Sequence, residues 1–204
     1  MKNMSEIQVI KRNGDREDLD IDKLHKVVFH ACDDITGVSP SQVEIKSNVQ
    51  FYNGITSEDI QETLIKSAAD LISEETPNYQ WVAGRLINYH LRKMVYNSYE
   101  PWHISRLIKV NTERGFYDPE LGSSYTEAEW DQLNNYMKHD RDNNIAYVGM
   151  EQFRGKYLVQ NRASGEIFET PQMAYMLIAA TLFSSYPADT RMRWVKGYYD
   201  AIST

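Results

Sequence analysis

Cysteine is almost absent from this sequence, because Cys32 is the only one among its 204 residues. A single thiol excludes an internal disulfide framework and fits a reducing cytoplasm. The residue lies in a segment with helical periodicity, beside Ala31. An unpaired cysteine in such a position is usually a small buried hydrophobe, and this is the role that we expect for Cys32.

Long apolar runs and excess positive charge are also missing. No run approaches the roughly 18–20 residues that a membrane-spanning helix needs, and the polar start contains no signal-peptide apolar block. The formal net charge of −7 argues against a broad basic surface for nucleic acid, although a local cluster of lysines can still hold a small anion. Zinc-ligand spacings, a P-loop and a dinucleotide-binding glycine pattern are absent too. We expect a globular cytoplasmic protein with no metal site of its own and no nucleic-acid or membrane partner.

The first recognisable pattern is a β-hairpin. Apolar and polar residues alternate before Asn13-Gly14, a strong hairpin signal because both positions tolerate positive φ. The return strand is predicted over roughly 15–19. Asp22 then caps a helix with apolar residues at helical spacing, and Gly37 ends it.

Three more helices are predicted in the same region. Residues 39–42, Ser-Pro-Ser-Gln, combine a serine cap, a proline at the first helical position and a glutamine that closes a capping box. A third helix begins at Thr56 with Asp59, and a fourth, longer one begins after Thr76. A hairpin and four helices make a compact first domain, which we assign to residues 1–97.

The second domain is predicted over 98–204, after Pro101 breaks the periodicity. We expect helical stretches at 102–113, 125–138 and 145–155, a hairpin turning at Ser164-Gly165, and helices that open at Pro171 and Asp189. The predicted fold class is therefore mainly α, with an N-terminal β-hairpin plus four helices followed by a helical domain with one further β-hairpin.

Short segments along nearly the whole chain resemble the large subunit of class I ribonucleotide reductases. The segments that resemble the ATP-cone of that family are 9–14, 19–24, 50–55, 65–72 and 90–93. Those that resemble the helical domain after the cone are 117–121, 139–142, 156–162, 165–167 and 198–204. No single segment is decisive, but their order and spacing together are specific.

The resemblance implies an oxidoreductase of deoxyribonucleotide biosynthesis for DNA replication, which reduces ribonucleoside diphosphates. In that family a small subunit generates a radical, a large-subunit cysteine carries it as a thiyl, and a cysteine pair supplies electrons. With Cys32 alone, this chain is expected to be inactive without the remaining part of the large subunit and the radical-generating small subunit. It carries no catalytic residue and no redox cofactor in this interpretation. Its own ligand is ATP or dATP with Mg²⁺, as allosteric effector.

The predicted effector site joins residues that are far apart in sequence. A triphosphate needs converging cations, and Lys11, Lys23 and Lys93 supply them, while a helix start near Asp22 adds N–H groups and a positive dipole end. By resemblance, the site residues are Lys11, Glu17, Asp18, Leu19, Asp20, Ile21, Asp22, Lys23, Ser57, Gln61, His90 and Lys93. Taken singly, each lysine is more often a solvated surface charge, and His90 alone is more often a core or rim histidine.

Gln61 departs from the family pattern, where a family member has a histidine that contributes to effector binding. A glutamine keeps hydrogen-bonding capacity but cannot become cationic near neutral pH. We therefore hypothesise that the cone binds a nucleotide but responds weakly or not at all to dATP.

Other interpretations stay open at the level of sequence. One alternative is a free-standing ATP-cone nucleotide sensor without a reductase partner. In the related repressor family a zinc ribbon precedes the cone, and this chain lacks the cysteines that would build one. An anaerobic, glycyl-radical reductase is another, which the segment 156–170 disfavours. The segment 139–142, His-Asp-Arg-Asp, suggests a helix-end cluster of salt bridges more than a metal or catalytic site.

The last predicted helix has no stop signal before Thr204. This leaves two explanations, a naturally split subunit or a partial chain. In the first case a partner polypeptide is expected to cover exposed apolar side chains after Pro171. The side chains that we expect there are Met176, Leu177, Phe183, Trp194 and Tyr198.

Overall fold

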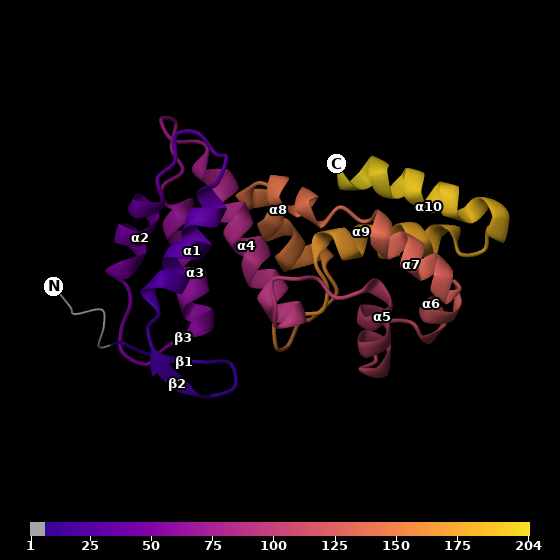
Figure 1. The fold of residues 1–204 in the computed structure, drawn as a ribbon, viewed down its shortest axis with the longest axis horizontal. Helices are drawn as coiled ribbons and strands as arrows, with labels where there is room; N and C mark the ends of the chain where they lie inside the picture. Colours follow the sequence, from indigo (N-terminus) through magenta and orange to yellow (C-terminus); the bar gives the residue numbers. More distant parts are fainter. Residues whose placement is uncertain (1–6) are drawn as a thin grey trace. The chain divides into compact units, whose positions relative to one another are not determined.

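A computed structural model describes residues 7–204, so residues 1–6 of the predicted first domain lie outside it. The chain forms two compact units (Figure 1): residues 7–90 with Asn143–Glu151, and Leu91–Asp142 with Gln152–Thr204. Helices dominate both, with a strand hairpin near the start and a smaller one later, which confirms the predicted fold class. In the part of the chain that is described, no helix has the length and apolar character needed to cross a membrane.

The first unit is built on a small sheet. Strand β1 (Gln8–Ile10) pairs antiparallel with β2 (Arg16–Asp18), and Gly14 in the turn between them has a φ of +88°. The hairpin therefore forms where predicted, although Gly14 and not Asn13 takes the positive φ. A third strand, β3 (Ile55–Thr56), pairs parallel with the other edge of β1 and was not predicted, because two residues carry no readable alternation.

Four helices of this unit pack beside the sheet: α1 (Ile21–Cys32), α2 (Pro40–Asn48), α3 (Ser57–Ala69) and α4 (Tyr79–Tyr96), of which α4 continues into the second unit. Their apolar stripes meet in a core where Val28, Val43, Leu64 and Leu86 are completely buried. Cys32 is also buried, and burial raises the pKa of its thiol to about 11, which confirms its role as a small core hydrophobe.

The helix starts follow the predictions only in part. Thr56 caps α3, since its hydroxyl accepts the Asp59 N–H at 2.9 Å, as predicted. The predicted Asp22 cap of α1 is wrong: Asp20 takes that position, because its carboxylate reaches the Lys23 N–H at 3.0 Å and the helix begins one residue later.

The predicted capping box of α2 is also wrong. Pro40 stands at the first helical position as expected, but the Ser39 side chain makes no capping hydrogen bond. The Gln42 side chain instead accepts a hydrogen bond from the Tyr79 hydroxyl at 2.6 Å, and the Ser39 N–H donates to the same hydroxyl at 2.9 Å. A tertiary contact with Tyr79, at the start of α4, thus replaces the local box.

Residues 143–146 return to the first unit and lie against α4. The Asn88 side-chain amide donates to the Asn143 side-chain oxygen at 2.9 Å, and the Arg85 guanidinium donates to the Asn143 carbonyl at 3.3 Å. Gly84 lies so near the Ile145 carbonyl oxygen that a β-carbon built on it would be 2.2 Å away. The short helix α8 (Tyr147–Gln152) follows this close contact.

The second unit is a helical body with the smaller hairpin. Its elements are α5 (Ile104–Glu113), α6 (Pro119–Ser123), α7 (Glu127–Tyr136), the 3₁₀ helix η2 (His139–Asn144), whose last two residues belong to the first unit, the π-helix η3 (Phe153–Tyr157), β4 (Gln160–Asn161), β5 (Glu166–Ile167), α9 (Pro171–Phe183) and α10 (Ala188–Ser203). Gly165, with a φ of +76°, lies in the predicted turn of the hairpin.

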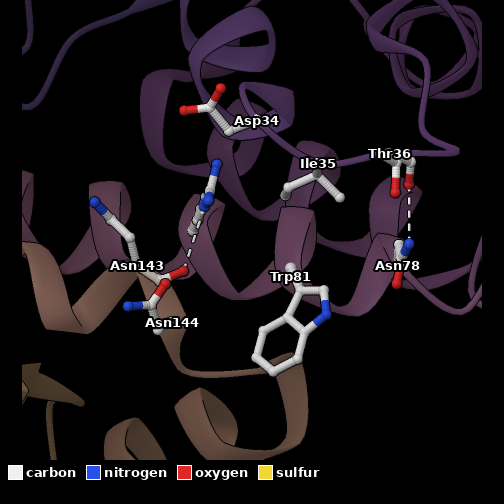
Figure 2. Close-up of a pocket in the computed structure, with 8 residues that line it drawn as sticks. Asp34, Ile35, Thr36, Asn78, Trp81, Asn143 and Asn144 are labelled. Carbon is white, nitrogen blue, oxygen red and sulfur yellow. Dashed lines mark hydrogen bonds between the residues drawn. The ribbon is translucent and has the colours of Figure 1, made fainter. Parts of the chain in front are cut away.

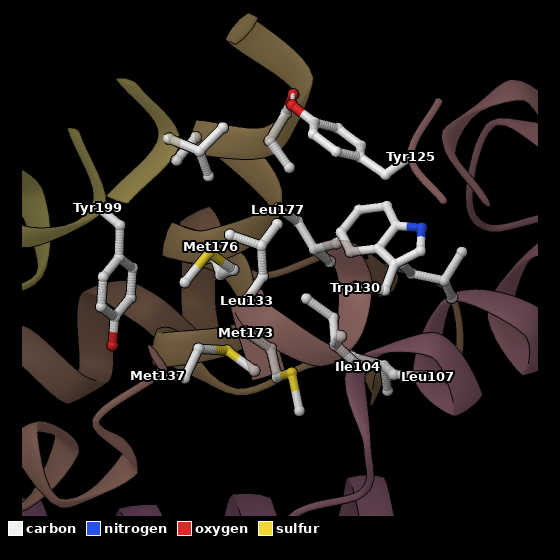
Figure 3. Close-up of a cluster of buried hydrophobic side chains, with 14 of the residues drawn as sticks. Ile104, Leu107, Tyr125, Trp130, Leu133, Met137, Met173, Met176, Leu177 and Tyr199 are labelled. Atoms are coloured by element: carbon white, nitrogen blue, oxygen red, sulfur yellow. Dashed lines mark hydrogen bonds between the residues drawn. The ribbon is translucent and has the colours of Figure 1, made fainter. Parts of the chain in front are cut away.

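The core of the second unit forms where α5, α7, α9 and α10 meet. Leu133, Met173, Met176 and Tyr199 lie together there and are completely buried (Figure 3). The expectation that Met176 and Leu177 would be exposed is therefore wrong, because this side of α9 faces α7 and the other core helices. Trp194 and Tyr198 are exposed as expected, at 52% and 37%.

Two ion pairs hold α10 in this unit. Arg191 binds Glu129 of α7 at 2.5 Å with both side chains largely buried, and its hydrogen bonds lower the pKa of Glu129 to about 2. Arg141 binds Asp200 at 3.0 Å. The segment 139–142 thus contributes a salt bridge, as predicted, and no cluster of three metal-ligating side chains exists among the residues described.

Asp142, in the same segment, is completely buried. Burial raises the pKa of its carboxyl to about 7. The positive charge of Arg92 acts in the opposite direction, because it favours the ionised form. Gln172 of α9 also favours the ionised form, but neither carboxylate oxygen makes a hydrogen bond of normal geometry with the described residues. The fold therefore tolerates a carboxyl group that it solvates poorly.

Candidate functional site

Lys11 and Ser57 leave the sheet of the first unit at the same edge. The parallel register pairs Ile10 with Thr56, so Lys11 directly follows β1 where Ser57 directly follows β3. Ser57 is also the first residue of α3, whose opening N–H groups and positive dipole end suit a phosphate. The sheet thus joins two predicted site residues that are far apart in sequence.

Glu17 and Asp18 lie on the neighbouring strand β2. The Lys11 ammonium lies 2.6 Å from the Glu17 carboxylate, with both side chains more than a third exposed. Asp18 pairs with Gln8 in the ladder and accepts a hydrogen bond from its side-chain amide. The lysine at this edge therefore already has a carboxylate partner, which a triphosphate would have to replace.

The start of α1 gathers the next group of predicted residues. Leu19 is buried, and its N–H donates to the Ile7 carbonyl at 2.8 Å, which fixes the chain as it enters the helix. Ile21 and Asp22 are exposed in the first turn. These residues leave β2 at the end that pairs with Gln8, the opposite end of the hairpin from Lys11.

Lys23 and Asp20 form the charged part of this helix start. The Lys23 ammonium lies 3.3 Å from the Asp20 carboxylate and is 69% exposed, so a ligand can reach it. The backbone N–H of Lys23 and its charge lower the pKa of Asp20. The helix start therefore presents a cation and an ionised carboxylate to solvent.

Gln61 and His90 lie further inside the first unit. The Gln61 side-chain oxygen, one turn after Ser57 on α3, is buried and accepts no hydrogen bond from the described residues. His90 on α4 is only 2% exposed, and its Nε2 atom lies 3.4 Å from the carboxylate of Glu62. An acceptor in this position is available to an N–H donor of a bound molecule.

Lys93 belongs to the last turn of α4, three residues after His90 and within the second unit. Its ammonium lies 4.4 Å from the centroid of the Tyr99 ring. The structure thus joins Lys11, Glu17 and Ser57 at one sheet edge and Asp20 to Lys23 at one helix start, and it sets Gln61 and His90 on two neighbouring helices.

Two further residues belong to this region but carry no sequence signal. Glu62 contacts His90 across the α3–α4 packing, and nothing in a single sequence pairs residues on different helices. Asn53 closes the sheet, because its side chain accepts the Gln8 N–H at 2.9 Å. Asn53 lies in the segment 50–55 that resembles the ATP-cone, but no role was predicted for its side chain.

A cavity of about 300 Å³ lies elsewhere in the first unit (Figure 2). Asp34, Ile35 and Thr36 line it together with Asn78, Trp81 and residues 143–144. Arg85 also lines it, but its guanidinium donates to the carbonyl of Asp33 at 2.5 Å and so fastens the end of α1. None of the predicted effector residues lines this cavity, so it is distinct from the candidate site.

Comparison with protein families matches two parts of the chain. The ATP cone domain matches residues 7–94, and the ribonucleotide reductase all-alpha domain matches residues 143–204. The first match contains all the predicted effector residues. The second match argues against a free-standing nucleotide sensor, because such a protein would not need the all-alpha domain of the reductase.

Individual relatives give the same result. The chain is 48% identical over 196 residues to ribonucleoside-diphosphate reductase 1 subunit alpha of Escherichia coli and 45% identical over 202 residues to subunit alpha of Haemophilus influenzae. It is 40% identical to subunit alpha of Enterobacteria phage T4. These alignments cover 96%, 97% and 98% of the chain but only 26% of each relative. The chain therefore comprises an ATP cone and residues of the ribonucleotide reductase all-alpha domain, and it spans about a quarter of the length of the alpha subunits to which it is similar.

Proposed function

We propose that the ATP cone, residues 7–94, binds ATP or dATP through Lys11, Glu17, Asp18, Leu19, Asp20, Ile21, Asp22, Lys23, Ser57, Gln61, His90 and Lys93. The observation that carries the proposal is the parallel pairing of β1 with β3, which brings Lys11 beside Ser57 and the start of α3. A lysine next to a helix N-terminus is a suitable partner for a triphosphate. The buried side-chain oxygen of Gln61 adds an acceptor for an N–H group of the nucleotide.

Magnesium enters this proposal together with the nucleotide. Mg²⁺ usually binds through substrate phosphates and one or two carboxylates and keeps several of its waters. Glu17 and Asp20, which lie beside the two exposed lysines, are suitable carboxylates. When Mg²⁺–triphosphate binds, Lys11 and Lys23 would exchange their carboxylate partners for phosphate oxygens, while the carboxylates would turn to the cation.

We further propose that the chain acts as the effector-binding part of a class I enzyme that reduces ribonucleoside diphosphates in the cytoplasm. The remaining part of the large subunit supplies the reactive cysteines, and a small subunit supplies the radical. Support comes from the identity with reductase alpha subunits, which are about four times as long as this chain. The single buried thiol also supports it, because burial raises its pKa and suppresses the thiolate.

Replacing Lys23 with alanine should weaken the binding of Mg²⁺–ATP about tenfold or more, because a charge-assisted hydrogen bond to a phosphate is worth about 1.5–3 kcal/mol. Isothermal titration calorimetry of the chain measures this. Lys26→Ala is the matched control, since Lys26 is an exposed lysine on the next turn of α1 and should leave the affinity unchanged. Equal losses in both variants, or none in Lys23→Ala, would contradict the proposed site.

Gln61 should limit the response to dATP. In wild-type chain we expect ATP to bind at least as tightly as dATP, because a neutral amide replaces the family's histidine at this position. Gln61→His should raise the affinity for dATP about 3–10-fold, as a charged donor strengthens a hydrogen bond by about 1 kcal/mol. Calorimetric titration with both nucleotides at pH 6 and pH 8 checks this. A tight dATP preference in wild type would refute the role of Gln61.

A further inference from the structure

The walls of the cavity in the first unit are tied to one another (Figure 2). The Arg85 guanidinium donates to the carbonyls of Asp33 and Asn143, at 2.5 and 3.3 Å, and so links the end of α1 to residue 143. The Asn78 side-chain amide donates to the Thr36 carbonyl at 2.9 Å. These bonds join all three segments that line the cavity, so its shape is set before any molecule enters it.

Trp81 and Ile35 give the cavity an apolar wall, and both side chains are half-buried. Among the residues described, the Trp81 ring makes no contact with another ring or with a cation. Its face is therefore available to a bound molecule, and a large aromatic side chain contributes strongly to binding when it is covered. Each of the other three tryptophans does contact a ring: Trp102 that of Tyr96, Trp130 that of Tyr125 and Trp194 that of Phe183.

Neutral polar groups surround this apolar wall. In the part of the chain that the structure describes, the Thr36 hydroxyl, the Trp81 indole N–H and the Asn144 side chain make no hydrogen bond. The Asn78 side chain uses only its nitrogen, and the Asn143 side chain uses only its oxygen. The groups that remain include both donors and acceptors of hydrogen bonds, and none of them is charged.

The charged groups at the cavity do not favour an ion. Arg85 is the only cation among the described residues that line it, and a phosphate would have to compete with the three backbone carbonyls to which Arg85 already donates. The Asp34 carboxylate is exposed and points away from Trp81 (Figure 2). An ammonium group on the Trp81 ring would therefore have no carboxylate beside it. The ligand that fits these walls is uncharged.

We propose that this cavity binds an uncharged sugar ring, a pyranoside. The C–H face of the ring would lie on the Trp81 indole. Its hydroxyl groups, each a donor and an acceptor, would pair with the side-chain amides of Asn78 and Asn144 and with the Thr36 hydroxyl. A cavity of about 300 Å³ is at the lower end of the range for small-molecule sites, which suits one such ring. The site goes beyond the effector proposal, since none of the effector residues lines it.

Both matched domains contribute to this site. Its residues between 34 and 85 belong to the ATP cone match, and residues 143–144 belong to the all-alpha match. A sugar that contacts both sets of residues would stabilise the attachment of the segment 143–146 to α4, because a ligand favours the state that binds it.

Nuclear magnetic resonance of the ¹⁵N-labelled chain, titrated with methyl β-D-glucopyranoside, tests the proposal. The indole N–H signal of Trp81 and the backbone N–H signals of Thr36, Asn78 and Asn144 should shift and saturate. We expect a dissociation constant on the order of 1 mM, which is usual for an uncharged ligand of this size. The indole signals of the other three tryptophans should not move, and adenosine, n-butylammonium chloride and sodium phosphate should bind more weakly.

Matched variants keep the result specific. Trp81→Leu should weaken binding at least tenfold, as loss of an aromatic anchor does, whereas Trp194→Leu should leave it unchanged. Asn144→Ala should weaken binding about threefold or more without affecting the fold, because this exposed side chain has no partner among the described residues. Asn135→Ala, at an exposed position of α7, is its control. Lys23→Ala should bind the glucoside as wild type does, so a failure of the effector proposal would leave this one standing.

Three results would overturn the inference. Signals that do not saturate, or that saturate equally in Trp81→Leu, would show that the sugar does not bind in the cavity. Tighter binding of adenosine, n-butylammonium or phosphate would assign the cavity to a flat base, a cation or an anion instead. Equal losses in Asn144→Ala and Asn135→Ala would show that the contact with the sugar is not specific to this site.

Discussion

Asp142→Asn is expected to stabilise the chain by about 2–4 kcal/mol at pH 8 and to change its stability little at pH 4. The carboxyl of Asp142 is completely buried, and burial raises its pKa from 3.8 to about 7. Asparagine has nearly the same shape and never ionises, so it removes the cost of holding a poorly solvated carboxylate.

The direction of the pH dependence follows from this raised pKa. Below about pH 4 the carboxyl is protonated in both the folded and the unfolded chain, and Asp142 costs nothing through ionisation. Between pH 4 and pH 7 the unfolded chain loses the proton while the folded chain keeps it, so the free energy of unfolding falls. Above pH 7 the folded group ionises as well and the loss levels off.

Urea unfolding of wild type and Asp142→Asn at several pH values between 4 and 8 measures this difference. The two stability profiles should diverge as the pH rises. The control is Asp140→Asn, because Asp140 lies two residues away but is exposed, and surface substitutions usually stay within about 0.5 kcal/mol. Parallel profiles for wild type and Asp142→Asn would disprove the raised pKa.

Gly84→Ala should destabilise the first unit by about 1–2 kcal/mol. The new methyl group would lie 2.2 Å from the Ile145 carbonyl oxygen and 3.2 Å from the carbonyl carbon of Ala146. Both neighbours are backbone atoms, so α4 and residues 145–146 must move apart, and overpacking of this kind costs about 1–3 kcal/mol or more. The better helix propensity of alanine, about 1 kcal/mol, offsets only part of this cost.

Gly197→Ala is the matched control for this second prediction. The same chemical change, again inside a helix, meets open space at Gly197 and should stabilise the chain by about 0.5–1 kcal/mol. Thermal unfolding followed by circular dichroism compares the two variants with wild type. If Gly84→Ala melts at the wild-type temperature or above it, the close approach of α4 and residue 145 is not real.

The features that could be predicted from the sequence are local ones. The Asn13-Gly14 hairpin, the Thr56 cap and the positions of α5, α7 and α9 depend on residues within a few positions of each other. The Asp22 cap was wrong by two residues, because Asp20, Asp22 and the polar residues around them offer equivalent capping oxygens. Only the conformation of the chain entering α1 from β2 selects Asp20.

The features that could not be predicted depend on tertiary contacts. Strand β3 is only two residues long, and it forms because it can pair with the free edge of β1. The predicted capping box of α2 does not form, because the Gln42 side chain accepts a hydrogen bond from the Tyr79 hydroxyl instead. For the candidate site, a resemblance supplied the residues and the fold supplied the nearness of Lys11 to Ser57. The buried state of Asp142 had no signal either, since its neighbours in sequence are charged.

Residues 143–146 have a consequence for how the protein is made. Gly84, Arg85 and Asn88 are contacted by a segment that the ribosome adds only after some fifty further residues. At the usual 5–20 residues per second, the nascent chain waits roughly 3–10 s before that side of α4 is covered. During synthesis the first unit therefore passes through a stage in which this side of α4 is still exposed, and a chaperone or protease can act on it then.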